Sequence, residues 1–115
     1  MLTRAEAIAM CLRLNDAFED YPFEDTNWTC MRRKTNHKIF AAIYERNGKM
    51  WINVKAEPLK VDFWQAAFPA VLPGWHMNKR HWISIMLDGT MDDEDIFMLV
   101  EESYNLVETR KRKRN

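Results

Sequence analysis

The segment Lys38-Ile39-Phe40-Ala41-Ala42-Ile43-Tyr44-Glu45-Arg46-Asn47-Gly48-Lys49-Met50-Trp51-Ile52-Asn53-Val54-Lys55 decides the fold, because it predicts two long strands and the turn that joins them. Asn47-Gly48 is the strongest short hairpin signal, since a type I′ turn needs positive φ at both central positions. The turn sets the register of the two strands. It places Arg46 opposite Lys49, Tyr44 opposite Trp51, Ile43 opposite Ile52, Ala42 opposite Asn53, Ala41 opposite Val54 and Phe40 opposite Lys55.

This register predicts two different faces for the hairpin, because successive side chains point to opposite sides of a sheet. One face is an aliphatic layer made by Ile39, Ala41, Ile43, Ile52 and Val54. The other face carries Phe40, Tyr44, Trp51, Asn53 and Lys55. The aliphatic face is expected to lie on the core.

The chain before the hairpin predicts a helix, a loop and a strand. Thr3 and Glu6 fit a capping box, so we expect a helix from about Arg4 to Asn15. Its buried face is predicted to contain Ala5, Ile8, Ala9 and Leu12. The acidic stretch Asp16 to Asp25 is predicted to be a loop, interrupted by Tyr21-Pro22-Phe23. A strand over Trp28 to Arg33 and a turn over 34–37 then lead into the hairpin.

The chain after the hairpin predicts a short helix, a strand and a long helix. We expect a helix over Val61 to Phe68, ended by Pro69, and a turn over Val71 to Gly74. From His81 the chain alternates, with Ile83, Ile85 and Leu87 on one side and Trp82, Ser84 and Met86 on the other. The last helix opens within Thr90 to Asp95 and reaches about Glu108. Its buried stripe is expected to be Ile96, Leu99, Val100, Ser103, Tyr104 and Val107.

Together these elements predict a single α+β domain, with an antiparallel sheet of a three-strand meander plus a C-terminal strand and with three helices. The domain is expected to span residues 1–109, followed by a basic tail over 110–115. A chain of 115 residues is long enough for one hydrophobic core. It contains no apolar run long enough to cross a membrane. The two cysteines, Cys11 and Cys30, are expected to be reduced thiols in a cytoplasmic protein, which is a simpler interpretation than a disulfide. A monomer is favoured.

The charged residues are unevenly distributed along the chain. The formal net charge is zero, yet five of the seventeen basic residues lie in the tail Arg110-Lys111-Arg112-Lys113-Arg114. Residues 1–109 therefore carry twelve basic and seventeen acidic groups, a net charge of −5. A body of this charge repels phosphate on average, which argues against a protein that binds DNA by overall charge alone. Local basic patches are then needed.

The hexad His76-Met77-Asn78-Lys79-Arg80-His81 is polar and rich in hydrogen-bonding groups, and it lies between Trp75 and Trp82. Its amide, ammonium, guanidinium and imidazole groups are the donors that proteins use on phosphates and base edges. The alternative is structural, because an asparagine in a turn often bonds nearby backbone and a histidine beside tryptophan often only packs. Trp75 and Trp82 are expected to anchor this segment.

The string Pro73-Gly74-Trp75-His76-Met77-Asn78-Lys79-Arg80-His81-Trp82, followed by Leu87-Asp88-Gly89 and Ser103-Tyr104-Asn105-Leu106-Val107, resembles the MmcQ/YjbR family. Pro22-Phe23, Lys38 to Ala41 and Ile52 to Lys55 agree with the same family. The resemblance covers nearly the whole chain, and it departs at Ile83-Ser84, where many members carry Asn-Thr. It implies a bacterial protein with a "double-wing" arrangement and predicted DNA binding.

Other site types find less support in the sequence. His76 and His81 lack a nearby cysteine or carboxylate that would complete a zinc site, and we expect no metal and no cofactor. There is no glycine-rich phosphate loop and no nucleophile motif, so we expect no enzyme. The hairpin face with Tyr44, Trp51, Asn53 and Lys55, extended by Trp82, is either a stacking platform and partner surface or a core face covered by a helix.

The function expected from the sequence is non-enzymatic DNA binding. Lys79 and Arg80 would contact phosphate, while His76, Asn78 and His81 would orient the segment or touch base edges. The tail, Arg110, Lys111, Arg112, Lys113 and Arg114, would add contacts that are independent of sequence. The alternative is a protein-interaction module that binds its partner on the aromatic face of Tyr44, Trp51, Asn53, Lys55 and Trp82.

Overall fold

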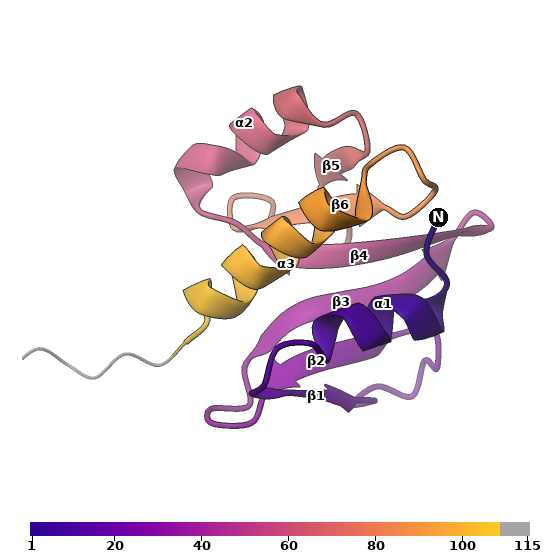
Figure 1. Cartoon of the computed structure of the whole chain (residues 1–115), viewed down its shortest axis with the longest axis vertical. Coiled ribbons are helices and arrows are strands. Elements are labelled where there is room, and N and C mark those ends of the chain that lie inside the picture. The colour runs from indigo at the N-terminus through magenta and orange to yellow at the C-terminus, as the bar shows by residue number, and fades with distance from the viewer. Residues whose placement is uncertain (109–115) are drawn as a thin grey trace, which may run out of the picture.

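The computed structural model describes residues 1–108, which form one antiparallel sheet and three helices (Figure 1). The elements are α1 (Arg4–Cys11), β1 (Ala17–Asp20), β2 (Thr29–Arg33), β3 (Ile39–Arg46), β4 (Lys49–Lys55), α2 (Pro58–Ala67), β5 (Val71–Pro73), β6 (Trp82–Met86) and α3 (Asp93–Leu106). The six strands lie in the order β1-β2-β3-β4-β6-β5. The α+β class is therefore confirmed, and the basic tail lies outside the described residues.

The β3–β4 hairpin has the register predicted from its turn. Arg46 pairs with Lys49, Tyr44 with Trp51, Ile43 with Ile52, Ala42 with Asn53 and Ala41 with Val54. Asn47 and Gly48 have φ values of 54° and 74°, as a type I′ turn requires. The turn dipeptide alone thus fixed the centre of the sheet.

A β-bulge changes the two faces at the start of β3. Met31 pairs with Ala41 but Arg32 pairs with Ile39, so Phe40 is an extra residue in β3. Phe40 is fully buried on the helix side, with its ring centroid 5.2 Å from that of Tyr104. Ile39 instead lines a pocket on the opposite face. The predicted faces of Ile39 and Phe40 were therefore wrong, because regular alternation takes no account of a bulge.

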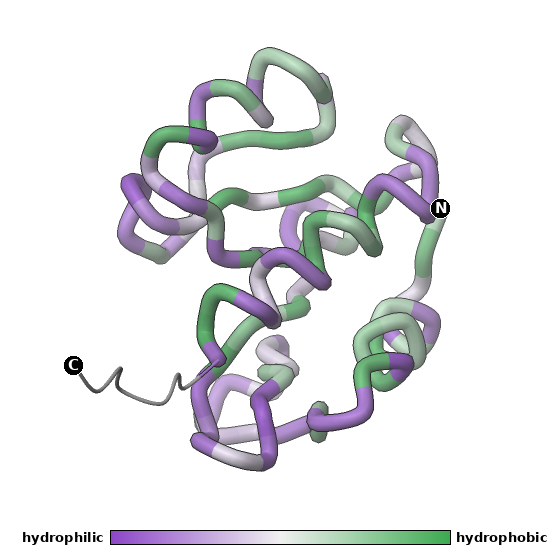
Figure 2. Tube along the Cα trace, turned by 60° about the vertical axis from the view of Figure 1, so that its left-hand side comes forward, coloured by the Kyte–Doolittle hydropathy of each residue, from purple (hydrophilic) through white to green (hydrophobic). Residues whose placement is uncertain are grey.

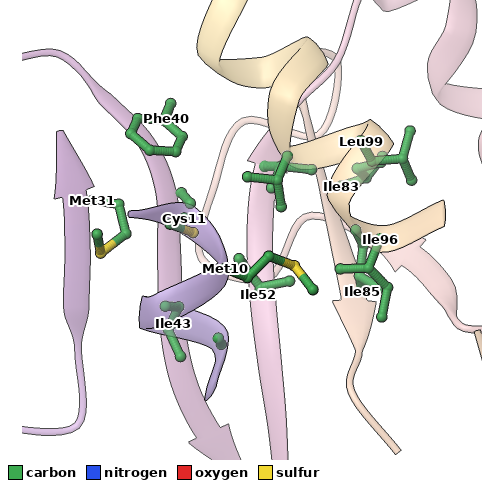
Figure 3. Packing of buried hydrophobic residues seen from close by; sticks show 14 of the residues in the cluster. Met10, Cys11, Met31, Phe40, Ile43, Ile52, Ile83, Ile85, Ile96 and Leu99 are labelled. Atoms are coloured by element: carbon green, nitrogen blue, oxygen red, sulfur yellow. The ribbon is translucent and has the colours of Figure 1, made fainter. Parts of the chain in front are cut away.

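One face of the sheet is covered by α1 and α3, and the core lies between these layers (Figure 3). α3 packs on β3 and β4 through Ile96, Leu99, Val100 and Ser103, as its stripe predicted. In Figure 2 hydrophobic residues concentrate along the strands and inner helix faces, and hydrophilic residues concentrate in many of the connections.

The predicted capping box of α1 is present, but the predicted buried face and end of this helix were wrong. The hydroxyl of Thr3 accepts from the Glu6 backbone N–H, and Glu6 accepts from that of Thr3. The helix ends at Cys11 rather than Asn15. Its buried residues are Ala7, Met10 and Cys11, whereas Ala5, Ala9 and Leu12 are exposed and only Ile8 of the predicted face packs, half-buried, against the core. The sequence offers two stripes at helical spacing, and the one with the longer Met10 side chain packs on the sheet.

Both edge strands lie where the sequence predicted no strand. β1 occupies part of the predicted acidic loop, and β5 replaces the predicted turn over Val71 to Gly74. β5 has three residues, and its Pro73 is tolerated because an edge strand has one side free of ladder hydrogen bonds. α2 begins at Pro58 instead of Val61, since proline is favoured in the first helical turn. Within residues 1–108, no helix has the length and apolar character to cross a membrane.

Candidate nucleic-acid interface

A buried polar network holds the β5–β6 loop, residues 74–81, against the sheet face that carries no α1 or α3. The side-chain amide of Asn53 donates to the Trp75 carbonyl at 2.8 Å, and the Trp75 N–H donates to the Ser84 hydroxyl at 2.9 Å. The hydroxyls of Tyr44 and Ser84 both donate to Oδ1 of Asn53. All the polar side chains of this network are nearly or fully inaccessible to solvent. The start of the loop is therefore rigidly attached to β4 and β6.

Three aromatic rings stack over the same network. The ring centroid of Tyr44 lies 4.5 Å from that of Trp28 and 5.0 Å from that of Trp75. The Arg46 guanidinium lies over the Trp75 ring, 4.6 Å from its centroid. The sequence left two alternatives for the aromatic sheet face, an open surface or cover by a helix. In the structure the β5–β6 loop and the aromatic stack cover it instead. Trp75 anchors the loop, as predicted.

The partner face expected from the sequence is not an open surface. Tyr44 and Asn53 are fully buried, because Trp28 and Trp75 stack on Tyr44 and the Trp75 carbonyl is bonded to Asn53. Trp51 is 6% exposed, and its indole N–H donates to the Arg46 carbonyl. Lys55 and Trp82, at the end of the face, are half-buried. A partner could therefore not stack on Tyr44 without displacing Trp28 or the β5–β6 loop.

The five predicted site residues of the β5–β6 loop do not form one cluster. His76 is exposed, has φ of 60°, and packs its ring 4.1 Å from that of Trp75. Asn78 accepts a hydrogen bond from the Arg80 N–H at 2.8 Å, which is the local turn role of asparagine. His81 is half-buried, and its carbonyl accepts from the Ala56 N–H. These contacts make Asn78 and His81 part of the loop's own structure.

Lys79 and Arg80 point away from this network and are exposed. With Pro58, Leu59, Val61 and Asp62 they line a shallow hollow against the first turns of α2. Lys79 Nζ donates to the Met77 carbonyl at 3.5 Å, and neither cation forms an ion pair with a carboxylate of residues 1–108. Both charges are therefore available to an external anion.

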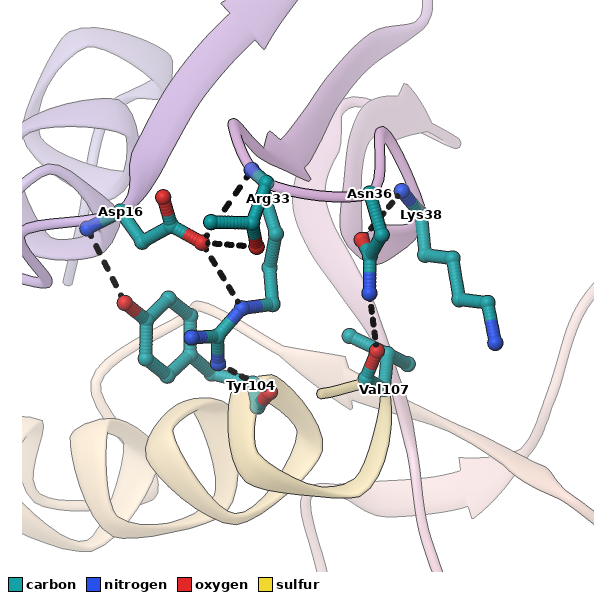
Figure 4. A network of polar contacts seen from close by, with 7 residues as sticks. Asp16, Arg33, Asn36, Lys38, Tyr104 and Val107 are labelled. Atoms are coloured by element: carbon teal, nitrogen blue, oxygen red, sulfur yellow. Dashed lines mark hydrogen bonds and ion pairs between the residues drawn. The ribbon is translucent and has the colours of Figure 1, made fainter. Parts of the chain in front are cut away.

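A second polar network fixes the β2–β3 turn to the end of α3 (Figure 4). Arg33 pairs with Asp16 at 3.1 Å, donates to the Tyr104 carbonyl at 2.9 Å and lies over the Tyr104 ring. The Asn36 amide donates to the Val107 carbonyl at 2.8 Å. The Thr35 hydroxyl donates to Asp16 and, with Arg33, holds the pKa of that carboxyl below its usual value. The β2–β3 turn is thus held to the C-terminal end of α3.

The strand register brings the β2–β3 turn and the β5–β6 loop to the same end of the sheet. β3 begins where β4 ends, and Lys55 at the end of β4 pairs with Trp82 at the start of β6. β2 and β6 are separated by β3 and β4, so the two loops lie about 14 Å apart at ordinary strand spacing. We call this end, with its exposed or half-exposed Lys34, Lys38, Lys55, Lys79 and Arg80, the basic end.

These five are the basic residues that no ion pair, aromatic ring or long-range hydrogen bond holds within residues 1–108. The others are bound by carboxylates, as are Arg32, Arg33, Lys49 and Lys60, by aromatic rings, as are Arg13 and Arg46, or by carbonyl oxygens, as is Arg4. Acidic residues gather at the other end, around Glu45, Asp88 and the first turn of α3. Carboxylates also occur at the basic end, where Asp16 is bound by the β2–β3 turn and Asp62 lines the hollow with Lys79 and Arg80.

Sequence reasoning found Lys79 and Arg80, missed Lys34 and Lys38, and assigned Lys55 to the alternative partner face instead of to the nucleic-acid site. Each of these lysines terminates or flanks a strand, and their proximity depends on which strand ends lie together. The confirmed hairpin register already placed the start of β3 beside the end of β4, so Lys38 and Lys55 could have been grouped from it.

The protein is a small α+β domain of the class that the sequence resemblance implied. Its six-stranded antiparallel sheet carries α1 and α3 on one face and the β5–β6 loop on the other. The chain belongs to the YjbR family, whose model matches residues 12–106. It is 28% identical over 116 residues to YjbR of Escherichia coli K12, covering 97% of this chain and 96% of that protein. It is 32% identical over 117 residues to YyaQ of Bacillus subtilis, covering 92% and 98%.

A shorter match, to YbdF of Escherichia coli O157:H7, is 38% identical over 74 residues and covers 64% of this chain and 61% of that protein. All three relatives are described as uncharacterized. Solved structures confirm the fold. A Pseudomonas syringae protein has a TM-score of 0.83 at 27% identity, covering 93% of this chain and all of its own. A Deinococcus radiodurans protein with a DUF419 domain has a TM-score of 0.81 at 27% identity, covering 93% and 79%.

Proposed function

We propose that this chain is a non-enzymatic DNA-binding protein that contacts the phosphate backbone through its basic end. The single observation that carries the proposal is that the five unpaired cations of the described chain share one end of the sheet. The β2–β3 turn and the β5–β6 loop would act as the two wings that the family resemblance implies. The free thiols of Cys11 and Cys30 fit a reducing, cytoplasmic location.

The roles of individual residues follow from their contacts. Lys79 and Arg80 on one wing, and Lys34 and Lys38 on the other, would each contact a phosphate. Asn78 and His81 shape the loop that presents Lys79 and Arg80. The tail cations Arg110 to Arg114, which lie outside the described residues, would add contacts that are independent of base sequence.

The unpaired cations at the basic end reduce the objection that a body with a net charge of −5 repels DNA, although Asp62 lines the hollow beside Lys79 and Arg80. Salt at physiological concentration screens exposed charges beyond about 8 Å, so the acidic end contributes little at the distance of the opposite end. The acidic end would instead orient the protein as it approaches a polyanion. Within the basic end, Glu57 lies near Lys60, with 3.9 Å between Oε1 and Nζ.

The test is duplex binding measured by fluorescence anisotropy over a series of salt concentrations. The variants are Lys34→Ala/Lys38→Ala, Lys79→Ala/Arg80→Ala, and a chain ending at Thr109. Each lost phosphate contact should reduce the slope of log K against log salt by about 0.9. Affinity should fall similarly for unrelated duplex sequences, because phosphate contacts do not depend on the bases.

The matched control is Lys49→Ala at the opposite end of the sheet, where Lys49 faces Asp88. It removes the same charge and should leave the salt slope unchanged. If the chain ending at Thr109 shows no binding, the basic end is not a DNA site and the tail alone binds. Unchanged binding by both double variants would lead to the same conclusion.

A further inference from the structure

A pocket of about 430 Å³ lies on the sheet face opposite α1 and α3, beside the stack of Trp28, Tyr44 and Trp75. The β1–β2 connection, strands β2 and β3, and the β5–β6 loop each contribute to its walls. Phe23, Asp25, Trp28, Ile39, Ala42 and His76 line it. Its volume is within the range of small-molecule sites, about 300–1,000 Å³.

The walls of the pocket are aromatic and held in place. Trp28 packs on Tyr44, and the ring centroids of Trp28 and His76 lie 6.3 Å apart. Phe23, which is 53% exposed, contributes a further aromatic ring to the lining. The bulge at Phe40 turns Ile39 into the pocket, where with Ala42 it forms an apolar floor. A flat apolar ligand would therefore meet preformed surfaces on several sides.

Polar groups in the pocket are few, and they differ in chemistry. Asp25 accepts from the Asn27 N–H through Oδ1, while its Oδ2 has no hydrogen bond or ion pair within residues 1–108. The His76 ring packs on Trp75 and has no hydrogen bond to the described chain. Cys30 also lines the pocket, and burial raises the pKa of its thiol, so it stays neutral. None of the lining residues is a lysine or arginine, so phosphate is not the group recognised.

We infer that this pocket binds a planar aromatic heterocycle carrying an amino group, of the size of a nucleobase. The rings of Trp28, Phe23 and His76 supply the aromatic contact, and the free oxygen of Asp25 accepts from the amino group. Such a heterocycle could arrive as a free nucleoside or as an unpaired base of a strand. The inference does not rest on DNA binding by the basic end, because the pocket uses different residues.

His76 supports a ligand role because it adopts left-handed backbone at the rim of the pocket. A non-glycine residue in this conformation is a source of strain that is often found at functional sites. Replacing it by glycine relieves that strain, so a purely structural histidine would be replaced at little cost.

The test is a titration with adenosine, followed by calorimetry and by the NMR shifts of the Cys30 and Ala42 amides. Uridine, which has no amino group, is the comparison ligand. Phe23→Ala, Asp25→Asn and His76→Gly should each weaken adenosine binding, by about tenfold for the Asp25 change. Asp62→Asn, an exposed carboxylate on α2, is the control and should leave affinity unchanged.

Two outcomes would overturn the inference: no shift of the pocket amides at millimolar adenosine, or equal affinity in wild type and all three pocket variants. Phe23 and Asp25 are exposed, so their variants are expected to fold, and thermal unfolding checks this. A short deoxyadenosine strand at high salt distinguishes the sources. Tighter binding of the strand than of adenosine assigns the pocket to an unpaired base, and equal binding assigns it to a free heterocycle.

Discussion

The side-chain amide of Asn53 donates a hydrogen bond to the Trp75 carbonyl at 2.8 Å, joining the middle of β4 to the start of the β5–β6 loop. The same side chain accepts from the hydroxyls of Tyr44 and Ser84, so it is the centre of a buried network. The loop that carries Lys79 and Arg80 is thus positioned by a residue that never reaches the surface. The network links sheet stability to the geometry of the basic end.

Asn53→Leu should lower the free energy of unfolding by about 2–4 kcal/mol, because it leaves the Trp75 carbonyl without a donor and the Ser84 hydroxyl without its acceptor in a buried site. Amide hydrogen exchange in the β5–β6 loop should also become faster. Urea unfolding and exchange measured by NMR check both effects. Asn78→Ala, in the same loop but exposed, is the control and should cost about 1 kcal/mol or less. A small stability loss for Asn53→Leu would contradict the network.

The β-bulge predicts opposite outcomes for two neighbouring residues. Phe40 is fully buried against Tyr104, so Phe40→Ala should cost about 3–5 kcal/mol in urea unfolding. Ile39 is half-buried at the pocket, so Ile39→Ala should cost about 1 kcal/mol. Simple alternation from the hairpin turn predicts the reverse order. Equal or inverted costs would show that Phe40 does not face the helices.

Ile39 and Phe40 mark the limit of what the sequence predicts about the sheet. A turn dipeptide sets pairing locally, so the register from Arg46–Lys49 to Ala41–Val54 was predictable. The bulge depends on how β2 pairs with β3, and no local sequence pattern predicts that pairing. The edge strands β1 and β5 were missed for a related reason, since each is short and exists through pairing with one neighbour.

The candidate site was predictable only in part. Lys79 and Arg80 stand out because they lie in a polar segment between tryptophans. Lys34 and Lys38 belong to the β2–β3 turn and Lys55 to the end of β4, and only the arrangement of the strands brings them to the same end as Lys79 and Arg80. The way in which the aromatic face is covered was not predictable either, because Trp28 was expected only as the start of a strand and Trp75 only as an anchor of the hexad segment.

Asp16 predicts a specific dependence of stability on pH. The Thr35 hydroxyl, 2.7 Å from its carboxylate, and Arg33 lower its pKa below the ordinary value of 3.8. The stabilising contribution of a carboxyl with a lowered pKa is complete above the ordinary value and is lost as pH falls through the folded-state value. The difference in urea midpoint between wild type and Asp16→Asn should therefore shrink between neutral pH and about pH 3. A constant difference would show that the charge of Asp16 does not matter.

The close packing of Gly74 against Trp82 predicts that a larger side chain at position 74 would change the geometry of the β5–β6 loop. A Cβ built at Gly74 would lie 2.8 Å from the Trp82 carbonyl oxygen and 2.9 Å from the Trp82 Cβ. Backbone cannot move aside as a flexible side chain can, so Gly74→Ala should cost about 1–3 kcal/mol. It should also shift the amide NMR signals of the loop and weaken duplex binding if Lys79 and Arg80 contact phosphate.

Gly48→Ala is the matched control for Gly74→Ala. A Cβ at Gly48 meets nothing within 4 Å, but its φ of +74° disfavours alanine, so stability should fall here too, by about 1 kcal/mol. The turn of Gly48 lies at the opposite end of the sheet from the basic end, so loop signals and duplex affinity should stay unchanged. If both variants lowered duplex affinity equally, the effect would follow from lost stability, and the position of the β5–β6 loop would not control binding.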